Sequence, residues 1–248
     1  MLFLLSGSLA GCAGPPRQET LSLFAASSLT EVIGDLESAF EAVHPEIDVM
    51  GSFAGSQILR LQIEQGAPAD VFLSANEEHV QALLDSGLIS ESRGVAYTEL
   101  VLVVPSDNPA GITSFEQLPR AQRVVLATEE VPAGAYARQM LQRAGELYGS
   151  EFVSSVLSHV VSEESSVRLV RAKVELGEAD AGIVYRTDAL GSEALTVVEI
   201  PVGLRLRADF YLGVVADSKH ADGLGLWLDY LDSDEGKDLF VQRGFGTL

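Results

Sequence analysis

The chain of 248 residues contains a single cysteine, Cys12, and only four histidines. One cysteine cannot form a disulfide within the chain, and it excludes a Cys-x-x-Cys redox or metal motif. The histidines are scattered and share no metal-ligand spacing: His44, His79, His159 and His220. The chain also lacks a Gly-x-Ser-x-Gly elbow, a His-Glu-x-x-His motif and a Gly-x-x-x-x-Gly-Lys phosphate loop. We therefore expect neither an enzyme nor a bound cofactor.

Basic residues are scarce, because 16 lysines and arginines stand against 36 acidic residues and give a net charge of −20. This balance argues against nucleic acid or an anionic membrane surface as a partner. It does not exclude a small anion. Charges are screened over about 8 Å at physiological salt, whereas a compact chain of this length has a radius of gyration of about 18 Å. Local hydrogen-bond donors therefore decide whether a cleft binds an anion.

Residues 1–11 are largely apolar but too few to span a bilayer, and they have the shape of an export signal. The sequence Leu9-Ala10-Gly11-Cys12 that ends this run resembles the bacterial lipoprotein box, in which the cysteine is acylated. We expect residues 1–19 to be signal, lipobox and tether, and the folded part to lie outside the cytoplasm on a lipid anchor. The alternative is an incidental or buried Cys12.

The hydrophobic pattern from residue 20 onward alternates between strand and helix periods. Strands are expected at 21–24, 47–51, 70–74, 99–105, 124–127, 181–185, 197–200 and 210–215, and helices at 29–43, 56–65, 76–86, 135–144, 151–159, 166–176, 224–231 and 235–242. This alternation predicts an α/β fold with mostly parallel sheets covered by helices.

The alternation restarts after the apolar strand at 99–105, which indicates two α/β domains with a ligand cleft between them. We expect domain I to comprise 20–102 plus 211–248, and domain II to comprise 103–210. Leu100–Val104 and Phe210–Val214 are the expected crossing strands.

Four stretches of small residues stand directly before predicted helices: Ala25-Ala26-Ser27-Ser28, Phe53-Ala54-Gly55-Ser56, Val131-Pro132-Ala133-Gly134 and Ser165-Ser166-Val167. Helix N-termini expose unpaired backbone N–H groups and carry the positive end of the helix dipole, so several that face one cleft form an anion site. A charge-assisted hydrogen bond contributes about 1.5–3 kcal/mol. A helix dipole adds only about 0.3–1 kcal/mol, so the hydrogen bonds carry most of the affinity.

Three of these stretches, and Tyr185 at the end of a predicted strand, also have a purely structural interpretation. Ser28-Leu29-Thr30-Glu31 has the form of a capping box, and Ser56 has the form of an ordinary N-cap. Pro132-Ala133-Gly134 can be a tight turn that feeds a helix. Tyr185 can be a half-buried aromatic residue whose hydroxyl finds any nearby acceptor. None of the four is diagnostic by itself.

Five segments in order resemble the extracytoplasmic molybdate-binding proteins of ABC transporters, and the likeness extends from Leu21 to Phe245. The segments are Leu23-Phe24-Ala25-Ala26-Ser27-Ser28-Leu29-Thr30, Ser52-Phe53-Ala54-Gly55-Ser56, Gly66-Ala67-Pro68-Ala69-Asp70-Val71-Phe72-Leu73-Ser74-Ala75, Val131-Pro132-Ala133-Gly134 and Gly182-Ile183-Val184-Tyr185.

The resemblance implies a two-domain periplasmic-binding-protein fold of type II that binds molybdate or tungstate and delivers it to an ABC permease. It implies hydroxyl and backbone donors from Ser28 and Ser56, backbone N–H donors from Ala133 and Val167, and a hydroxyl donor from Tyr185. We expect a monomer. Molybdate carries no proton at neutral pH, so a site made only of donors suits it, whereas monohydrogen phosphate brings a donor and requires an acceptor.

Several alternatives remain open at this point. Glu129, Glu130, Glu163 and Glu164 flank two of the four stretches, and a glutamate that pointed inward would favour phosphate or a cation. We expect instead a solvated acidic edge. Sulfate is also fully deprotonated and differs chiefly in size. Ferric iron would need converging tyrosine, histidine and carboxylate ligands, and a small organic acid is a further alternative. The alternative from another class is an enzyme on the same bilobed fold.

Overall fold

The computed structural model describes residues 19–248, so Cys12 and its predicted lipobox lie outside the described residues. The strands are β1 (Glu19–Ala26), β2 (Ile47–Ala54), β3 (Val71–Ser74), β4 (Ile89–Pro105), β5 (Val124–Ala127), β6 (Val160–Glu164), β7 (Ala181–Tyr185), β8 (Leu195–Val198), β9 (Arg207–Val215) and β10 (Gly246–Thr247). The α-helices are α1 (Thr30–Val43), α2 (Ser56–Glu64), α3 (Glu77–Asp85), α4 (Pro132–Tyr148), α5 (Ser150–Ser158), α6 (Val167–Glu175), α7 (Arg186–Ala189), α8 (Ala221–Asp232) and α9 (Asp234–Gln242). Short 3-10 helices cover η1 (Ser27–Leu29), η2 (Phe115–Arg120) and η3 (Val202–Leu204).

The main sheet runs in the order β2-β1-β3-β9-β4-β7-β5-β6, and β8 and β10 pair with β4. The outer strands of each half pair in parallel, β2-β1-β3 at one end and β7-β5-β6 at the other. The strands between them, β9 and β4, pair antiparallel with their neighbours. The α/β fold with largely parallel sheet groups is therefore confirmed.

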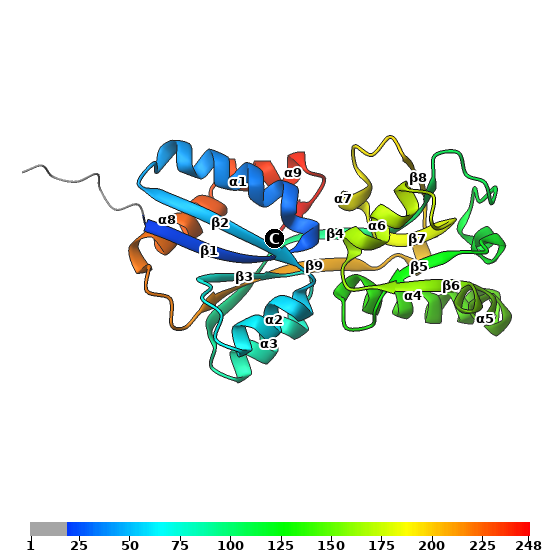
Figure 1. The fold of residues 1–248 in the computed structure, drawn as a ribbon, viewed down its shortest axis with the longest axis horizontal. Coiled ribbons are helices and arrows are strands. Elements are labelled where there is room, and N and C mark those ends of the chain that lie inside the picture. Colours follow the sequence, from blue (N-terminus) through cyan, green and yellow to red (C-terminus); the bar gives the residue numbers. More distant parts are fainter. Residues whose placement is uncertain (1–18) are drawn as a thin grey trace, which may run out of the picture.

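Helices cover both faces of the sheet in two lobes (Figure 1). In the first lobe, α1, α8 and α9 lie on one face of β2-β1-β3, and α2 and α3 lie on the other. In the second lobe, α4 and α5 lie on one face of β7-β5-β6, and α6 and α7 lie on the other. Within residues 19–248, no helix combines the length and apolar character needed to cross a membrane.

The long strand β4 joins the lobes by changing partners along its length. Glu99 lies opposite Arg207 of β9, whereas Leu100 lies opposite Tyr185 of β7. The change of lobe therefore lies just before the crossing strand expected at Leu100–Val104. The second crossing expected at Phe210–Val214 also lies too far along the chain. Residues Tyr211–Val214 of β9 already pair with β3 of the first lobe, so the chain has crossed before them. The division into 20–102 plus 211–248 and 103–210 remains a proposal.

Two strands differ from the expected pattern. The strand expected at 99–105 begins ten residues earlier, at Ile89, because a polar and partly exposed stretch extends β4 along β9. The strand β6 was not expected at all, because its residues Val160–Glu164 are only partly buried. Its presence puts Ser165 directly after a strand, so each of the four small-residue stretches lies between a strand and a helical segment. The structure also adds the short elements α7, β10, η1, η2 and η3.

The first turn of α4 lies against the end of β5 at Gly134. A Cβ atom at Gly134 would lie 1.9 Å from the Thr128 carbonyl oxygen and 2.6 Å from that of Ala127. Backbone atoms cannot move aside as a flexible side chain can. The absence of a side chain at Gly134 therefore sets how closely the start of α4, including the neighbouring Ala133, approaches the sheet.

We expect Gly134→Ala to lower the free energy of unfolding by about 1–3 kcal/mol through overpacking. The control is Gly34→Ala on α1, where nothing lies within 4 Å of an added Cβ; it should raise the stability by about 0.5–1 kcal/mol, because glycine is costly within a helix. Urea unfolding of both variants measures the two changes. Equal stability of the two variants would contradict this account of the α4 position.

Candidate functional site

All five residues expected in the site line one cavity between the lobes. Its lining consists of Ala26, Ser27, Ser28, Ala54, Gly55, Ser56, Ala75, Val131, Pro132, Ala133, Val167 and Tyr185. The cavity volume is about 10 Å³, roughly the space that one water molecule needs and far below the roughly 300–1,000 Å³ of pockets for drug-sized ligands. The cavity therefore excludes a large ligand in this closed arrangement. The binding role of the five residues remains a proposal.

The starts of four helical segments meet at this cavity, two from each lobe. The segments η1 and α2 belong to the first lobe, and α4 and α6 belong to the second. The first N–H groups of a helix have no acceptor within the helix. In α4 the first bond is donated by Ala135 to the Val131 carbonyl, and in α6 Val170 donates to Ser166. The N–H groups of Ala133 and Val167 precede these donors and need a partner from elsewhere.

Neither serine forms the cap that the purely structural interpretation requires. The helix α1 is preceded by the 3-10 turn η1, and no side chain caps either segment, so the capping-box interpretation of Ser28 is wrong. At α2 the N-cap residue is Gly55, and Ser56 lies one position later. The Ser56 Oγ accepts a hydrogen bond of 3.1 Å from the Ala75 N–H. The Ser56 hydroxyl proton is therefore free to be donated to a ligand.

The phenol of Tyr185 lies at the end of β7 and is 1% exposed. Its hydroxyl has no hydrogen-bond partner within residues 19–248. Burial raises the pKa of the Tyr185 phenol well above its ordinary value, so the group stays protonated. A buried hydroxyl without a partner is costly. An acceptor within the cavity would satisfy Tyr185.

No charged side chain lines the cavity. Glu129 and Glu130 are exposed, and Glu163 forms an ion pair with Arg138. Glu164 binds the Lys173 ammonium at 2.6 Å, and this contact and the Ser162 hydroxyl outweigh partial burial and lower its pKa. The expectation of an acidic edge outside the site agrees with this placement.

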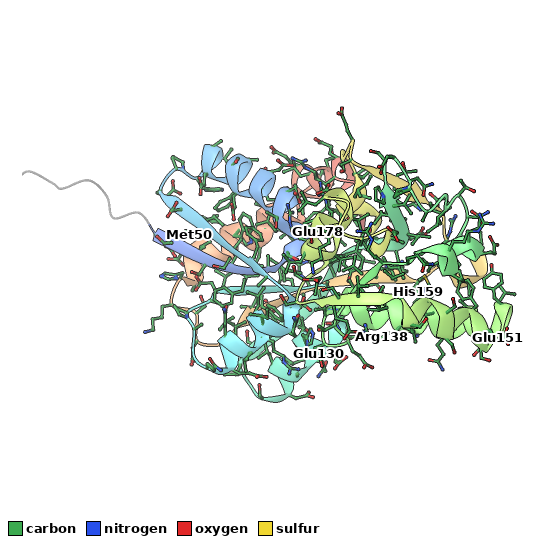
Figure 2. The ribbon with its side chains drawn as sticks, turned by 45° about the vertical axis from the view of Figure 1, so that its right-hand side comes forward. Met50, Glu130, Arg138, Glu151, His159 and Glu178 are labelled. Atoms are coloured by element: carbon green, nitrogen blue, oxygen red, sulfur yellow. The ribbon has the colours of Figure 1, made fainter. Side chains whose placement is uncertain are left out.

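Three contacts connect the lobes around the cavity. The Gln57 amide donates to the Ser165 carbonyl at 3.0 Å, and the His79 Nε2 donates to the Glu130 carbonyl at 3.1 Å. Burial lowers the pKa of His79, so the ring is a neutral donor. Figure 2 shows Glu130 at the border of the lobes, near the helices α2 and α3.

The third contact is an ion pair between α6 and α1. The Nη1 atom of Arg168 donates to both carboxylate oxygens of Glu31 at 2.7 Å. Sequence reasoning missed all three contacts, because their partners lie 51 to 137 positions apart. The structure is therefore closed over the cavity.

Behind Tyr185 lies a buried carboxyl group that sequence reasoning also missed. Asp188 is 4% exposed, and its Oδ2 has no hydrogen-bond partner among the described residues. Burial is the largest effect on this group and raises its pKa to about 7, although Arg168 and a hydrogen bond from the Tyr185 backbone oppose the rise. Asp188 therefore changes its charge near neutral pH.

The family model for bacterial extracellular solute-binding proteins matches residues 21–246. YvgL of Bacillus subtilis, whose name describes a substrate-binding lipoprotein of an ABC transporter, is 34% identical over 96% of this chain and 92% of its own. The molybdate-binding protein ModA of Escherichia coli is 31% identical over 91% of this chain and 88% of its own. The solved sulfate-binding protein SubI of Mycobacterium tuberculosis has a TM-score of 0.80 at 19% identity, over 92% of this chain and 86% of SubI.

The chain has the two-domain fold of the periplasmic binding proteins, with a cavity between its lobes. The chain belongs to the bacterial extracellular solute-binding protein family. The resemblance found in the sequence is confirmed by the ModA relatives, and the family consists of solute-binding transport proteins.

We expect Asp188→Asn to raise stability at alkaline pH and to leave it unchanged at acidic pH. The folded pKa of about 7 lies above the ordinary aspartate value of 3.8, so the unfolded chain releases this proton first. Asp188 therefore costs nothing below about pH 4, and its cost grows as the pH rises towards 7 and then levels off. The test compares the melting temperatures of the wild type and of Asp188→Asn at pH 5 and at pH 8.5. At each pH the other titrating groups contribute equally to both proteins, so the difference in melting temperature reports Asp188. An equal difference at both pH values would refute the assignment.

Proposed function

We propose that the protein captures molybdate or tungstate in this cavity and delivers it to the permease of an ABC transporter. The observation that carries the proposal is the chemistry of the lining, which offers hydroxyl and backbone donors but no charged side chain. Ser28, Ser56, Ala133, Val167 and Tyr185 are the proposed ligands. The 31% identity with the Escherichia coli ModA supports the choice of ion.

A doubly charged anion in such a cavity must be balanced by dipoles. Each hydrogen bond to a charged group contributes about 1.5–3 kcal/mol, and each helix start adds about 0.3–1 kcal/mol, up to about 2 in a buried geometry. Several such donors account for tight binding without arginine or lysine. The net charge of −20 acts weakly at the site, because most of it lies beyond the screening length.

Selectivity follows from the absence of a carboxylate in the lining. Monohydrogen phosphate would bury a proton that requires a strong acceptor, and the Ser56 Oγ is already engaged by the Ala75 N–H. Sulfate is the second candidate, because it has no proton and because SubI shares the fold. Sulfate and the larger metal oxide ions differ chiefly in size, so their measured affinities decide between them.

The proposal includes a monomeric protein held outside the cytoplasm by a lipid on Cys12. The Leu-Ala-Gly-Cys sequence and the lipoprotein name of the Bacillus subtilis relative support the anchor. Metabolic labelling with a fatty acid should mark the wild-type protein and not the Cys12→Ser variant.

We expect molybdate and tungstate to raise the melting temperature strongly, sulfate less, and phosphate almost not at all. A ligand that binds only the folded state stabilises it by mass action. Titration calorimetry with the four ions gives the affinities. Equal affinity for sulfate and molybdate would contradict the assignment of molybdate or tungstate as the preferred ion, but the protein would still be an oxyanion receptor. Failure to bind any of the four ions would refute the proposed function.

We expect Tyr185→Phe to weaken molybdate binding by about 1.5–3 kcal/mol, the value of a hydrogen bond to a charged partner. The ligand-free variant should not lose stability, because the Tyr185 hydroxyl has no partner among the described residues. The control is Tyr148→Phe, whose exposed hydroxyl donates to Glu116 at 3.1 Å, at the far end of α4. Calorimetry and thermal melting of both variants test the assignment, and unchanged affinity of Tyr185→Phe would contradict it.

A further inference from the structure

The ion pair between Arg168 and Glu31 lies directly beside the proposed anion ligands on both lobes. Arg168 follows Val167 in the first turn of α6, and Glu31 lies in the first turn of α1, three residues after Ser28. Both side chains are partly exposed, at 35% and 43%. The pair therefore stands beside the cavity, and neither charged group lines it.

This pair can exist only when the lobes are close together. The helix α1 belongs to the first lobe and α6 to the second, and the two oxygen contacts of 2.7 Å would be lost if the lobes moved apart by a few ångströms. The other two contacts across the cavity, from Gln57 and His79, are made by neutral donors to carbonyl groups. Of the three contacts, the ion pair alone weakens strongly with salt.

The surroundings of Arg168 favour this partner. The neighbouring Arg171 is held within its own helix by Glu175, with 2.8 Å between Nε and Oε1. The carboxyl of Asp188 lies close enough to be influenced by Arg168, but it is buried and has no ion pair. Arg168 therefore forms its ion pair with Glu31 when the two lobes come together.

We propose that Arg168 and Glu31 form a latch that sets how long the closed protein retains its anion. They are positioning residues that hold the two sets of neutral donors together, and neither binds the anion. This inference rests on the proposed function of the cavity. No charged side chain needs to contact the anion in this arrangement. The ion pair slows release of the anion by holding the lobes together outside the cavity.

A direct electrostatic effect of these charges on the anion predicts that Glu31→Gln changes the release rate in the opposite direction from a latch. If Arg168 attracted the anion directly, then Arg168→Gln would speed release, and Glu31→Gln would slow it by removing a repulsive charge. A latch requires both partners. Both variants should then release the anion faster, by about threefold to fivefold, the effect of a favourable partly exposed ion pair.

The experiment measures release of labelled molybdate from the full-length protein after rapid mixing with excess unlabelled molybdate. Arg168→Gln and Glu31→Gln should each speed release, and the double variant should release no faster than either single one. The exchanged pair, Glu31→Arg with Arg168→Glu, should return the rate towards the wild-type value. Raising the salt from about 0.01 M to 1 M shortens the Debye length from roughly 30 Å to 3 Å. This change should speed release from the wild type and leave the two single variants nearly unchanged.

The matched control is Arg171→Gln, which removes the same charge one turn later on α6 without breaking a contact between lobes. Its release rate should stay at the wild-type value. The ligand-free melting temperatures should be nearly unchanged at about pH 5, where Asp188 stays protonated and is insensitive to the lost arginine charge, which separates a latch from a general loss of stability. Single variants that change release in opposite directions, or not at all, would overturn the latch while leaving the proposed function intact. Failure of the wild type to retain molybdate, tungstate or sulfate would overturn both.

Discussion

A buried helix start must find acceptors for N–H groups that its own helix cannot satisfy, and this constraint shapes the centre of the molecule. Four helical segments begin at one cavity, and no charged or long polar side chain stands at the first residue of any of them. The strand ends of β1, β2, β5 and β6 lead the chain to these points. The sheet geometry therefore creates the donor cluster, and the side chains of Ser56 and Tyr185 complete it.

The same cluster reconciles the acidic surface with the proposed anion site. Two carboxylates near the cavity are held outside it by ion pairs. Glu163 pairs with Arg138, and Glu164 pairs with Lys173. Asp188, three residues after Tyr185, is an exception, because it is buried and its Oδ2 has no hydrogen-bond partner among the described residues. Its raised pKa allows the proton to remain near neutral pH, which limits the negative charge close to the cavity.

Much of the fold could be predicted from the sequence, because helix and strand periods are strong where one face is buried. The same reasoning failed for β6 and for the first half of β4, whose exposed polar residues leave no such period. The five site residues could be selected from small-residue stretches and from family likeness. The contacts of Arg168, Gln57 and His79 could not, because each links distant segments and depends on how the lobes close.

The exchange of partners along β4 has a mechanical consequence. Because one unbroken strand serves the first lobe up to Glu99 and the second from Leu100, each half of β4 can travel with its own sheet. A torsion of the extended backbone near that junction would move the lobes relative to each other while the ladders on either side stay intact. Such a joint would restrict the relative path of the lobes, so that the halves of the cavity would return to the same alignment whenever the lobes meet.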